Sequence, residues 1–193
     1  PKLAPIQVAI VPIFKSDEDL NDIRQKLEPV LNGLKQMGLS VKFDDDDKRR
    51  PGFKFADYEL KGIPVRLAMG ARDLENNTIE IMRRDTLEKE TISLDGICEH
   101  IAQLLNDIQE NIYNKAISYR DAHIYECNNY DEFKERIADG GFFLCPWDGT
   151  PETEAQIKQE TLATIRCIPF GVSQENLGVD MVSGKPAKFR AVI

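Results

Sequence analysis

The sequence predicts an α/β domain with a five-stranded mixed sheet and flanking helices, followed by a small α+β domain. Strand-like and helix-like patterns alternate through the first half of the chain, as they do in proteins with parallel or mixed sheets. A helical pattern then runs without proline or glycine between Gly96 and Gly140. Shorter helix and strand patterns follow it. We therefore expect two domains, 1–105 and 106–193, joined by a long helix.

The first domain opens with a strand and an amphipathic helix. Residues 7–14 form a short apolar run rich in β-branched side chains, which is typical of a buried strand. Ser16 is a favourable helix N-cap, and acidic residues follow it at the positive end of the helix. Apolar residues then recur at helical spacing until Gly38, and we expect Pro29 to bend this helix. A second strand is expected at 39–43.

A charged loop leads from there into a shorter helix and three more strands. Pro51 suits the first turn of a helix that ends before Gly62, and we interpret Phe53 as a core residue. A polar turn around Arg84 and Asp85 joins the last two strands of the domain. The three strands are expected at 63–69, 78–82 and 90–94.

The second domain is entered through the helical pattern that starts after Asp95. Apolar residues keep a near-helical period along it, and we expect the helix to continue through 119–127. Gly140 and Gly141 end a further helix. In this domain we expect helices at 130–138 and 152–161 and strands at 142–146, 163–169 and 189–193.

The composition is that of a folded protein with an acidic balance of charge. Hydrophobic residues make up 41% and charged residues 30%, which is normal for a soluble globular chain. No apolar run approaches the ~20 residues that a membrane helix needs, so we expect no membrane partner. The net charge of −8 taken alone argues against nucleic acid. The only basic stretch, from Lys48 to Lys89, fits a solvated face as well as RNA contact.

Cysteine and histidine provide no sign of a reactive centre. The four cysteines are scattered without a CxxC pair, and the two histidines fall in or near the long helix. We interpret all four cysteines as buried structural thiols, which fit a reducing, cytoplasmic compartment. The residues concerned are Cys98, Cys127, Cys145, Cys167, His100 and His123.

Two segments carry a resemblance to a known family. Residues 51–75, PGFKFADYELKGIPVRLAMGARDLE, resemble the signature of the anticodon-binding domain of class II aminoacyl-tRNA synthetases, and the opening APIQVAIVPI is similar to its first strand. The segment that starts with ADGGFFLCPWDGT resembles the zinc-binding-like C-terminal domain of prolyl-tRNA synthetases of the archaeal and eukaryotic type. The resemblance covers essentially the whole chain.

The resemblance implies recognition of the tRNA(Pro) anticodon within an enzyme that attaches proline to its tRNA. It also implies a homodimeric parent and a catalytic domain, in the same polypeptide, that binds ATP and Mg²⁺. The motifs of that domain do not occur here, so we expect a C-terminal piece that is inactive alone, as the start at Pro1 and the end at Ile193 also suggest. A non-catalytic protein-interaction module derived from a synthetase stays open, because the acidic second domain would suit docking to a protein.

Guanine recognition dictates which residue types to seek, because proline anticodons carry two guanines. Bases in a loop stack on aromatic side chains. Guanine offers N1–H and N2–H₂ donors to a carboxylate, and O6 and N7 acceptors to Arg or Lys. By the resemblance, the residues at guanine-recognising positions are Phe55, Glu59, Arg66, Arg72, Asp73 and Lys89. Candidate phosphate contacts are Lys48, Arg49, Arg50 and Lys54.

These residues also have plainer interpretations. Phe55 could be a core residue, Glu59 a solvated helix charge, and the pair Arg72 and Asp73 could be turn residues after Gly70. Without the resemblance the plainer interpretation would be preferred at each position.

The resemblance also raises the question of zinc, which many members of the subgroup hold with four cysteines. None of the matching positions is a thiolate, so we predict no zinc and no other cofactor in this chain. Trp147 and its apolar neighbours are then expected to hold this turn by packing alone. The matching positions are Asp148, Thr153, Met181 and Ser183.

Overall fold

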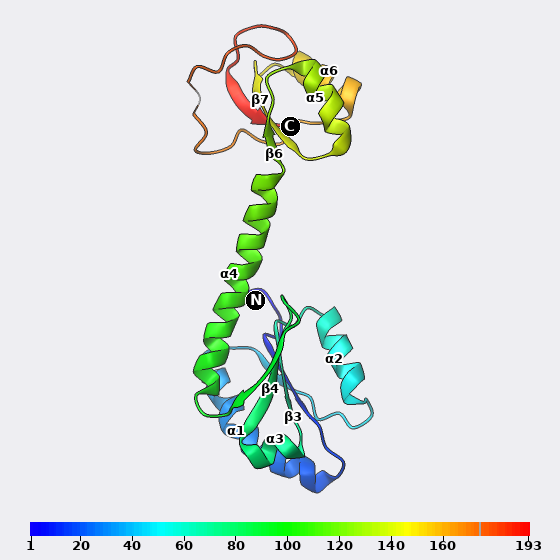
Figure 1. Ribbon diagram of the computed structural model, residues 1–193, viewed down its shortest axis with the longest axis vertical. Coiled ribbons are helices and arrows are strands. Elements are labelled where there is room, and N and C mark those ends of the chain that lie inside the picture. Colours follow the sequence, from blue (N-terminus) through cyan, green and yellow to red (C-terminus); the bar gives the residue numbers. More distant parts are fainter. Residues whose placement is uncertain (174) are drawn as a thin grey trace. The chain divides into compact units, whose positions relative to one another are not determined.

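The structure is a computed structural model that describes residues 1–173 and 175–193. The chain folds into two compact units, Pro1–Lys115 and Ala116–Ile193 (Figure 1). The division falls inside α4 (Ile97–Ala122), later in the same helix than the boundary expected from the sequence.

The first unit is built on the predicted five-stranded mixed sheet, with strand order β2-β1-β3-β4-β5. β1 runs parallel to β2 and β3, whereas β4 and β5 are added in antiparallel fashion. All five strands lie where the sequence predicts them. Their bounds are β1 (Val8–Pro12), β2 (Val41–Phe43), β3 (Val65–Met69), β4 (Thr78–Arg83) and β5 (Lys89–Ser93).

Helices lie on both faces of this sheet. α1 (Asp17–Gln36) and α4 bury their apolar sides against one face and form the main core with inward residues of the strands. α2 (Pro51–Leu60) lies on the opposite face, where Tyr58 packs against Ala9 and Val11 of β1 (Figure 1). The β5 side chains Lys89 and Thr91 remain exposed, so this second face is only partly covered.

Local signals explain where these helices begin. The Ser16 side chain accepts a hydrogen bond from Asp19 N, while the Asp19 carboxylate accepts one from Ser16 N, which is the expected cap of α1. A short helix that was not predicted from the sequence, α3 (Ala71–Asn76), directly follows β3. The prediction for Phe53 is wrong: 59% of this residue is exposed, because Lys54 and Tyr58 occupy the inward side of α2.

A buried polar cluster ties α2 to the end of β2. The Lys54 Nζ atom donates to the carbonyl oxygen of Asp44 at 2.9 Å and lies 3.3 Å from its carboxylate Oδ1. The Tyr58 hydroxyl donates to Asp44 Oδ2 at 2.5 Å. Burial would raise the pKa of Asp44, but the hydrogen bonds from Tyr58 and Asp46 N and the charge of Lys54 outweigh it and hold that pKa below its ordinary value.

The second unit is organised around a three-stranded sheet with strand order β6-β7-β8. β6 (Ile124–Glu126) runs parallel to β7 (Phe142–Trp147), and β8 (Phe189–Val192) pairs with β7 in antiparallel fashion. α5 (Tyr130–Arg136), a 3₁₀ turn (Ile137–Asp139) and α6 (Pro151–Thr161) complete the unit. The core includes Phe133, Phe143, Cys127, Cys145, Ile157 and Ile193.

Three predictions for the second unit are wrong. The helix does not continue as far as residue 127, because α4 ends at Ala122 and residues 124–126 pair with β7 as a strand. Residues 163–169 form no strand and contribute one isolated bridge, between Cys167 and Val192. Cys167 is exposed rather than buried, whereas Cys145 lies in β7, where burial raises the pKa of its thiol to about 12.

Two buried carboxylates hold the turn that follows β7, so packing alone does not explain it. Asp148 Oδ1 accepts hydrogen bonds from Thr150 N and from the hydroxyls of Thr150 and Thr153 at 2.8–3.0 Å, and Oδ2 accepts one from Ser183 Oγ at 2.9 Å. Asp180 accepts from Asp148 N at 3.1 Å and from Ser183 N at 2.6 Å. Burial would raise the pKa of Asp148, but these donors outweigh it and lower the pKa to about 2.

The cluster around Asp44 generates a first testable prediction. Asp44→Asn leaves the buried Lys54 ammonium without its counter-charge, and we expect the free energy of unfolding of the first unit to fall by about 3 kcal/mol. Amide hydrogen exchange of β1 and β3 measures this unit alone. Asp47→Ala, at an exposed position of the same loop, is the control and should cost under about 0.5 kcal/mol. Equal effects of the two changes would contradict a buried ion pair.

The lowered pKa of Asp148 generates a prediction for acid stability. A carboxyl with a folded pKa of about 2, against an ordinary 3.8, stabilises the fold above pH 3.8 and loses that contribution as the pH falls through about 2. We expect Asp148→Asn to lower the free energy of unfolding by about 2 kcal/mol at neutral pH. In acid, the difference in free energy of unfolding between the variant and the unaltered chain should become much smaller.

Fluorescence of Trp147, the one tryptophan of the chain, measures unfolding of the second unit. Glu152→Gln, in the exposed first turn of α6, controls for the loss of one negative charge. If the difference in free energy of unfolding between Asp148→Asn and the unaltered chain stayed constant from neutral pH to about pH 2, Asp148 would be ruled out as the titrating group.

Candidate functional site

Part of the sheet face on the α2 side is not covered by helix. Arg66 on β3 lies opposite Met82 on β4, and Met82 lies opposite Lys89 on β5, so these three side chains form a row across the strands. Glu80 and Thr91 form a second row on the same face. We call these five residues the open face. Polar and charged side chains dominate it.

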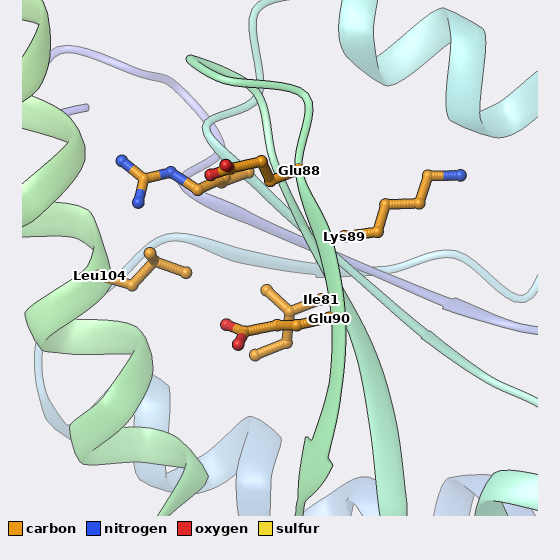
Figure 2. A pocket seen from close by; sticks show the side chains of 6 residues that line it. Ile81, Glu88, Lys89, Glu90 and Leu104 are labelled. Carbon is orange, nitrogen blue, oxygen red and sulfur yellow. The ribbon is translucent and has the colours of Figure 1, made fainter.

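The other face of β5 points toward α4. Figure 2 shows Lys89 directed away from Ile81, Glu90 and Leu104. The last three line a hollow of about 330 Å³ between β5 and α4, which Lys89 also borders although its side chain is directed away. The alternation of side chains along β5 therefore separates Lys89, on the open face, from the two glutamates beside it in the sequence.

Arg66 and Phe55 form a stacked pair next to the open face. The guanidinium carbon of Arg66 lies 3.6 Å from the centre of the Phe55 ring, and Nη2 donates to Glu80 Oε1 at 3.0 Å. Only 4% of Arg66 is exposed. Its Nη1 atom is buried and has no hydrogen-bond partner in the described part of the chain. Phe55 is therefore more than a core residue, since it orients a buried cation through ring stacking.

Arg72 and Asp73 lie on α3, beside the open face. Asp73 Oδ2 accepts a hydrogen bond from Gly70 N at 3.0 Å, and Oδ1 accepts one from the Thr78 hydroxyl at 3.3 Å. The Asp73 carboxylate therefore caps α3. A hollow of about 680 Å³ adjoins both residues and reaches β5 at Thr91, while the Arg72 side chain is exposed.

Glu59 is exposed on α2, one helical turn beyond Phe55. Its backbone carbonyl accepts a hydrogen bond from Arg84 Nε at 2.7 Å, which ties the end of α2 to the turn between β4 and β5. Across residues 1–173 and 175–193 we find no hydrogen bond to its carboxylate. The acid is therefore available to a ligand.

The candidate phosphate contacts have different environments. Lys48 and Arg50 are exposed before α2, whereas Arg49 binds Asp46 at 2.8 Å. The prediction for Lys54 is wrong, because its ammonium group is 2% exposed and bound to Asp44 in the interior. The helical spacing of Lys54 and Tyr58 is the sequence signal that could have placed Lys54 on the inward side.

Sequence reasoning also missed Glu80, which contacts Arg66. The alternation of the predicted strand 78–82 contained a usable signal, because it places Glu80 on the opposite face from Ile79 and Ile81. What the strand pattern could not supply was the antiparallel register that brings Glu80 diagonally across from Arg66.

The positions that match zinc ligands do not fit zinc in this chain. Asp148, Thr153 and Ser183 converge, but the Asp148 oxygens already accept hydrogen bonds from both hydroxyls. Met181 packs against the apolar core of the second unit. A single carboxylate with hydroxyls is a poor donor set for zinc, which prefers thiolate and imidazole. Among the described residues, no group of three or more His, Cys, Asp or Glu side chains is arranged to hold a metal.

Among the described residues, every helix is too short or too polar to cross a membrane.

Comparisons with known proteins agree with the geometry of both units. Residues 7–104 match the family model of the anticodon binding domain, and residues 130–193 match that of the prolyl-tRNA synthetase C-terminal region. Similar curated proteins are the proline–tRNA ligases of Phocaeicola vulgatus, 63% identical over 194 residues, Bacteroides fragilis, 60% over 195, and Porphyromonas gingivalis, 58% over 192. Each alignment covers 100% of this chain and 39% of the relative. Since the first model spans half of its residues, the chain belongs to the anticodon-binding domain family.

Proposed function

We propose that this chain recognises the anticodon of tRNA(Pro) as the RNA-reading part of a proline–tRNA ligase. The observation that carries the proposal is the open face, where an exposed Lys89 and a stacked, buried Arg66 occupy one row of a sheet in an anticodon-binding fold. Neighbouring strands are about 4.8 Å apart, so the row from Arg66 to Lys89 spans roughly 10 Å. This width suits single splayed bases.

The exposed side chains around the open face have the chemistry that guanine requires. Lys89 and Arg72 are donors for the O6 and N7 acceptors, and Glu59 is an acceptor for N1–H and N2–H₂. Lys48 and Arg50 lie at the start of α2, where exposed cations can contact phosphate. Phe55 supplies an aromatic ring at this edge of the face.

The chain spans 39% of the length of the relatives, so the activity of the whole protein is part of the proposal. We infer that the parent attaches proline to tRNA(Pro), using ATP and Mg²⁺ in a catalytic domain of the same polypeptide. We also infer a homodimeric parent and a cytoplasmic location. The resemblance of the second unit supports the archaeal and eukaryotic subgroup, although the relatives named above are bacterial.

We further infer that the second unit folds without zinc. Asp148 and Asp180 provide the links that hold the turn after β7 to the loop before β8, and both carboxylates are buried and hydrogen bonded. This arrangement replaces the cross-link that a structural metal supplies in other small domains.

Anticodon reading predicts selective RNA binding. We expect the chain to bind a hairpin with the proline anticodon more tightly than one whose two anticodon guanines are replaced by adenine. We expect Lys89→Ala to weaken binding to the first hairpin roughly 10-fold, because it removes a donor to a guanine. Fluorescence anisotropy at one stated salt concentration measures both.

Lys26→Ala is the matched control, because it removes the same charge from the exposed side of α1, on the other face of the sheet. Its effect should be under about 2-fold. Equal and negligible binding of both hairpins by the unaltered chain would instead favour the protein-interaction module.

The zinc inference has a direct measurement. Protein purified without chelator should contain far less than one zinc per chain by elemental analysis. Treatment with EDTA should leave the unfolding midpoint, followed by Trp147 fluorescence, unchanged, because no described side-chain cluster depends on a metal. Stoichiometric zinc that resists dialysis would overturn the inference.

A further inference from the structure

Two carboxylates lie at the open face and a third is exposed on α2, and the three differ in what they can offer a ligand. Both oxygens of Asp73 accept hydrogen bonds within the protein, from Gly70 N and from the Thr78 hydroxyl. Glu59 lies on the exposed side of α2. Glu80 lies on the sheet itself, with its side chain 35% exposed and Oε1 bound to Arg66. In the described part of the chain, no hydrogen bond to Glu80 Oε2 is found.

We propose that Glu80 reads one anticodon guanine, accepting hydrogen bonds from N1–H and N2–H₂ at Oε2 while Oε1 stays bound to Arg66. This inference rests on the proposed function and adds a specificity residue to it. Guanine presents two adjacent donors on this edge, whereas adenine presents an acceptor at N1. A carboxylate in this position therefore favours guanine and repels adenine.

The surroundings of Glu80 hold its carboxylate in one orientation before RNA binds. Arg66 is 4% exposed and stacked on Phe55, so it offers little surface to a base. Its Nη2 atom fixes Glu80 Oε1 at 3.0 Å. The stacked pair therefore acts through Glu80, and Arg66 is a positioning residue. A donor or acceptor fixed in advance loses less conformational entropy when its partner binds.

The neighbours of Glu80 suit the remaining edge of guanine. Thr91 lies directly opposite Glu80 on β5 and lines the hollow of about 680 Å³ that Arg72 also lines. Lys89 precedes Thr91 on the same face of that strand. A base held at its Watson–Crick edge by Glu80 thus has exposed cations within reach for O6 or N7, on Arg72 or Lys89.

Glu80→Gln is the informative substitution. Its amide oxygen can keep the hydrogen bond from Arg66, which protects the fold, while its NH₂ group replaces the free acceptor with a donor. Two donors then face each other at the guanine edge. Glu80→Ala would be less informative, because it would leave the buried Arg66 cation without its partner.

The test uses the full chain and anticodon hairpins that carry guanosine or inosine at each of the two guanine positions. Inosine lacks the N2 amino group, so it removes one donor and leaves O6 and N7 in place. We expect the unaltered chain to prefer guanosine roughly 10-fold at one position. In Glu80→Gln this preference should fall to about 2-fold or less at that position and persist at the other.

Glu90→Gln serves as the second variant, because it removes the same charge one residue before Thr91, on the face of β5 that is turned away from the open face. It should leave the guanosine preference unchanged. Far-ultraviolet circular dichroism confirms that each variant is folded.

Two results would overturn the assignment of Glu80. One is an equal loss of affinity for guanosine and inosine hairpins in Glu80→Gln, which would indicate a purely structural role. The other is an equal loss of preference in Glu90→Gln, which would indicate that the loss of one negative charge anywhere on β4 or β5 explains the effect. Failure of the proposed function looks different: the unaltered chain would then not distinguish guanine from adenine hairpins at all, and the assignment of Glu80 would fall with it.

Discussion

The buried contact between Lys54, Asp44 and Tyr58 is the constraint on which the open face depends. A lysine and an aspartate removed from water are tolerated only when their charges meet and their remaining polar atoms are hydrogen bonded. This contact fixes α2 against the end of β2 at a single rotation about its axis. Because Phe55 is next to Lys54 and Glu59 is next to Tyr58, the same rotation decides where both of these side chains lie. A purely apolar contact would resist sliding or rotation of the helix less strongly.

The two faces of the sheet have different roles. One face receives α1 and α4 and contains the main apolar core, which supplies most of the free energy of folding. The other receives only α2, so the antiparallel strands β4 and β5 extend the sheet beyond the cover of that helix. Strand alternation then sends every second residue of these two strands to a partly hydrated surface. Polar side chains on this surface are thus placed on rigid strands, where their positions are better defined than on loops.

Much of this arrangement can be predicted from the sequence, and there are physical reasons why the rest cannot. Periodicity and the Ser16 cap locate α1 and the five strands of the first unit, because these signals are local. The strand at Ile124–Glu126 was missed because its partner, Phe142–Leu144, lies across a helix and a turn, and tertiary pairing overrides a helical pattern. Of the candidate site, the family resemblance supplied six residues but not Glu80, and it could not show which carboxylates already have partners within the protein. Capping by Asp73 and the contact between Glu80 and Arg66 depend on register and distance, which appear only in the fold.

The stack of Arg66 on Phe55 has a consequence for how this surface can change through evolution. A planar guanidinium is needed both to lie flat on the ring and to reach the carboxylate of Glu80, and lysine can do neither in the same way. Loss of the Phe55 ring, the Arg66 cation or the Glu80 carboxylate would each leave one of the other two without its partner. Substitutions at these three positions are therefore expected to occur together, because a single substitution is destabilising unless a second one compensates for it. The composition of the open face would then change by jumps between a few compatible combinations of residues at these three positions.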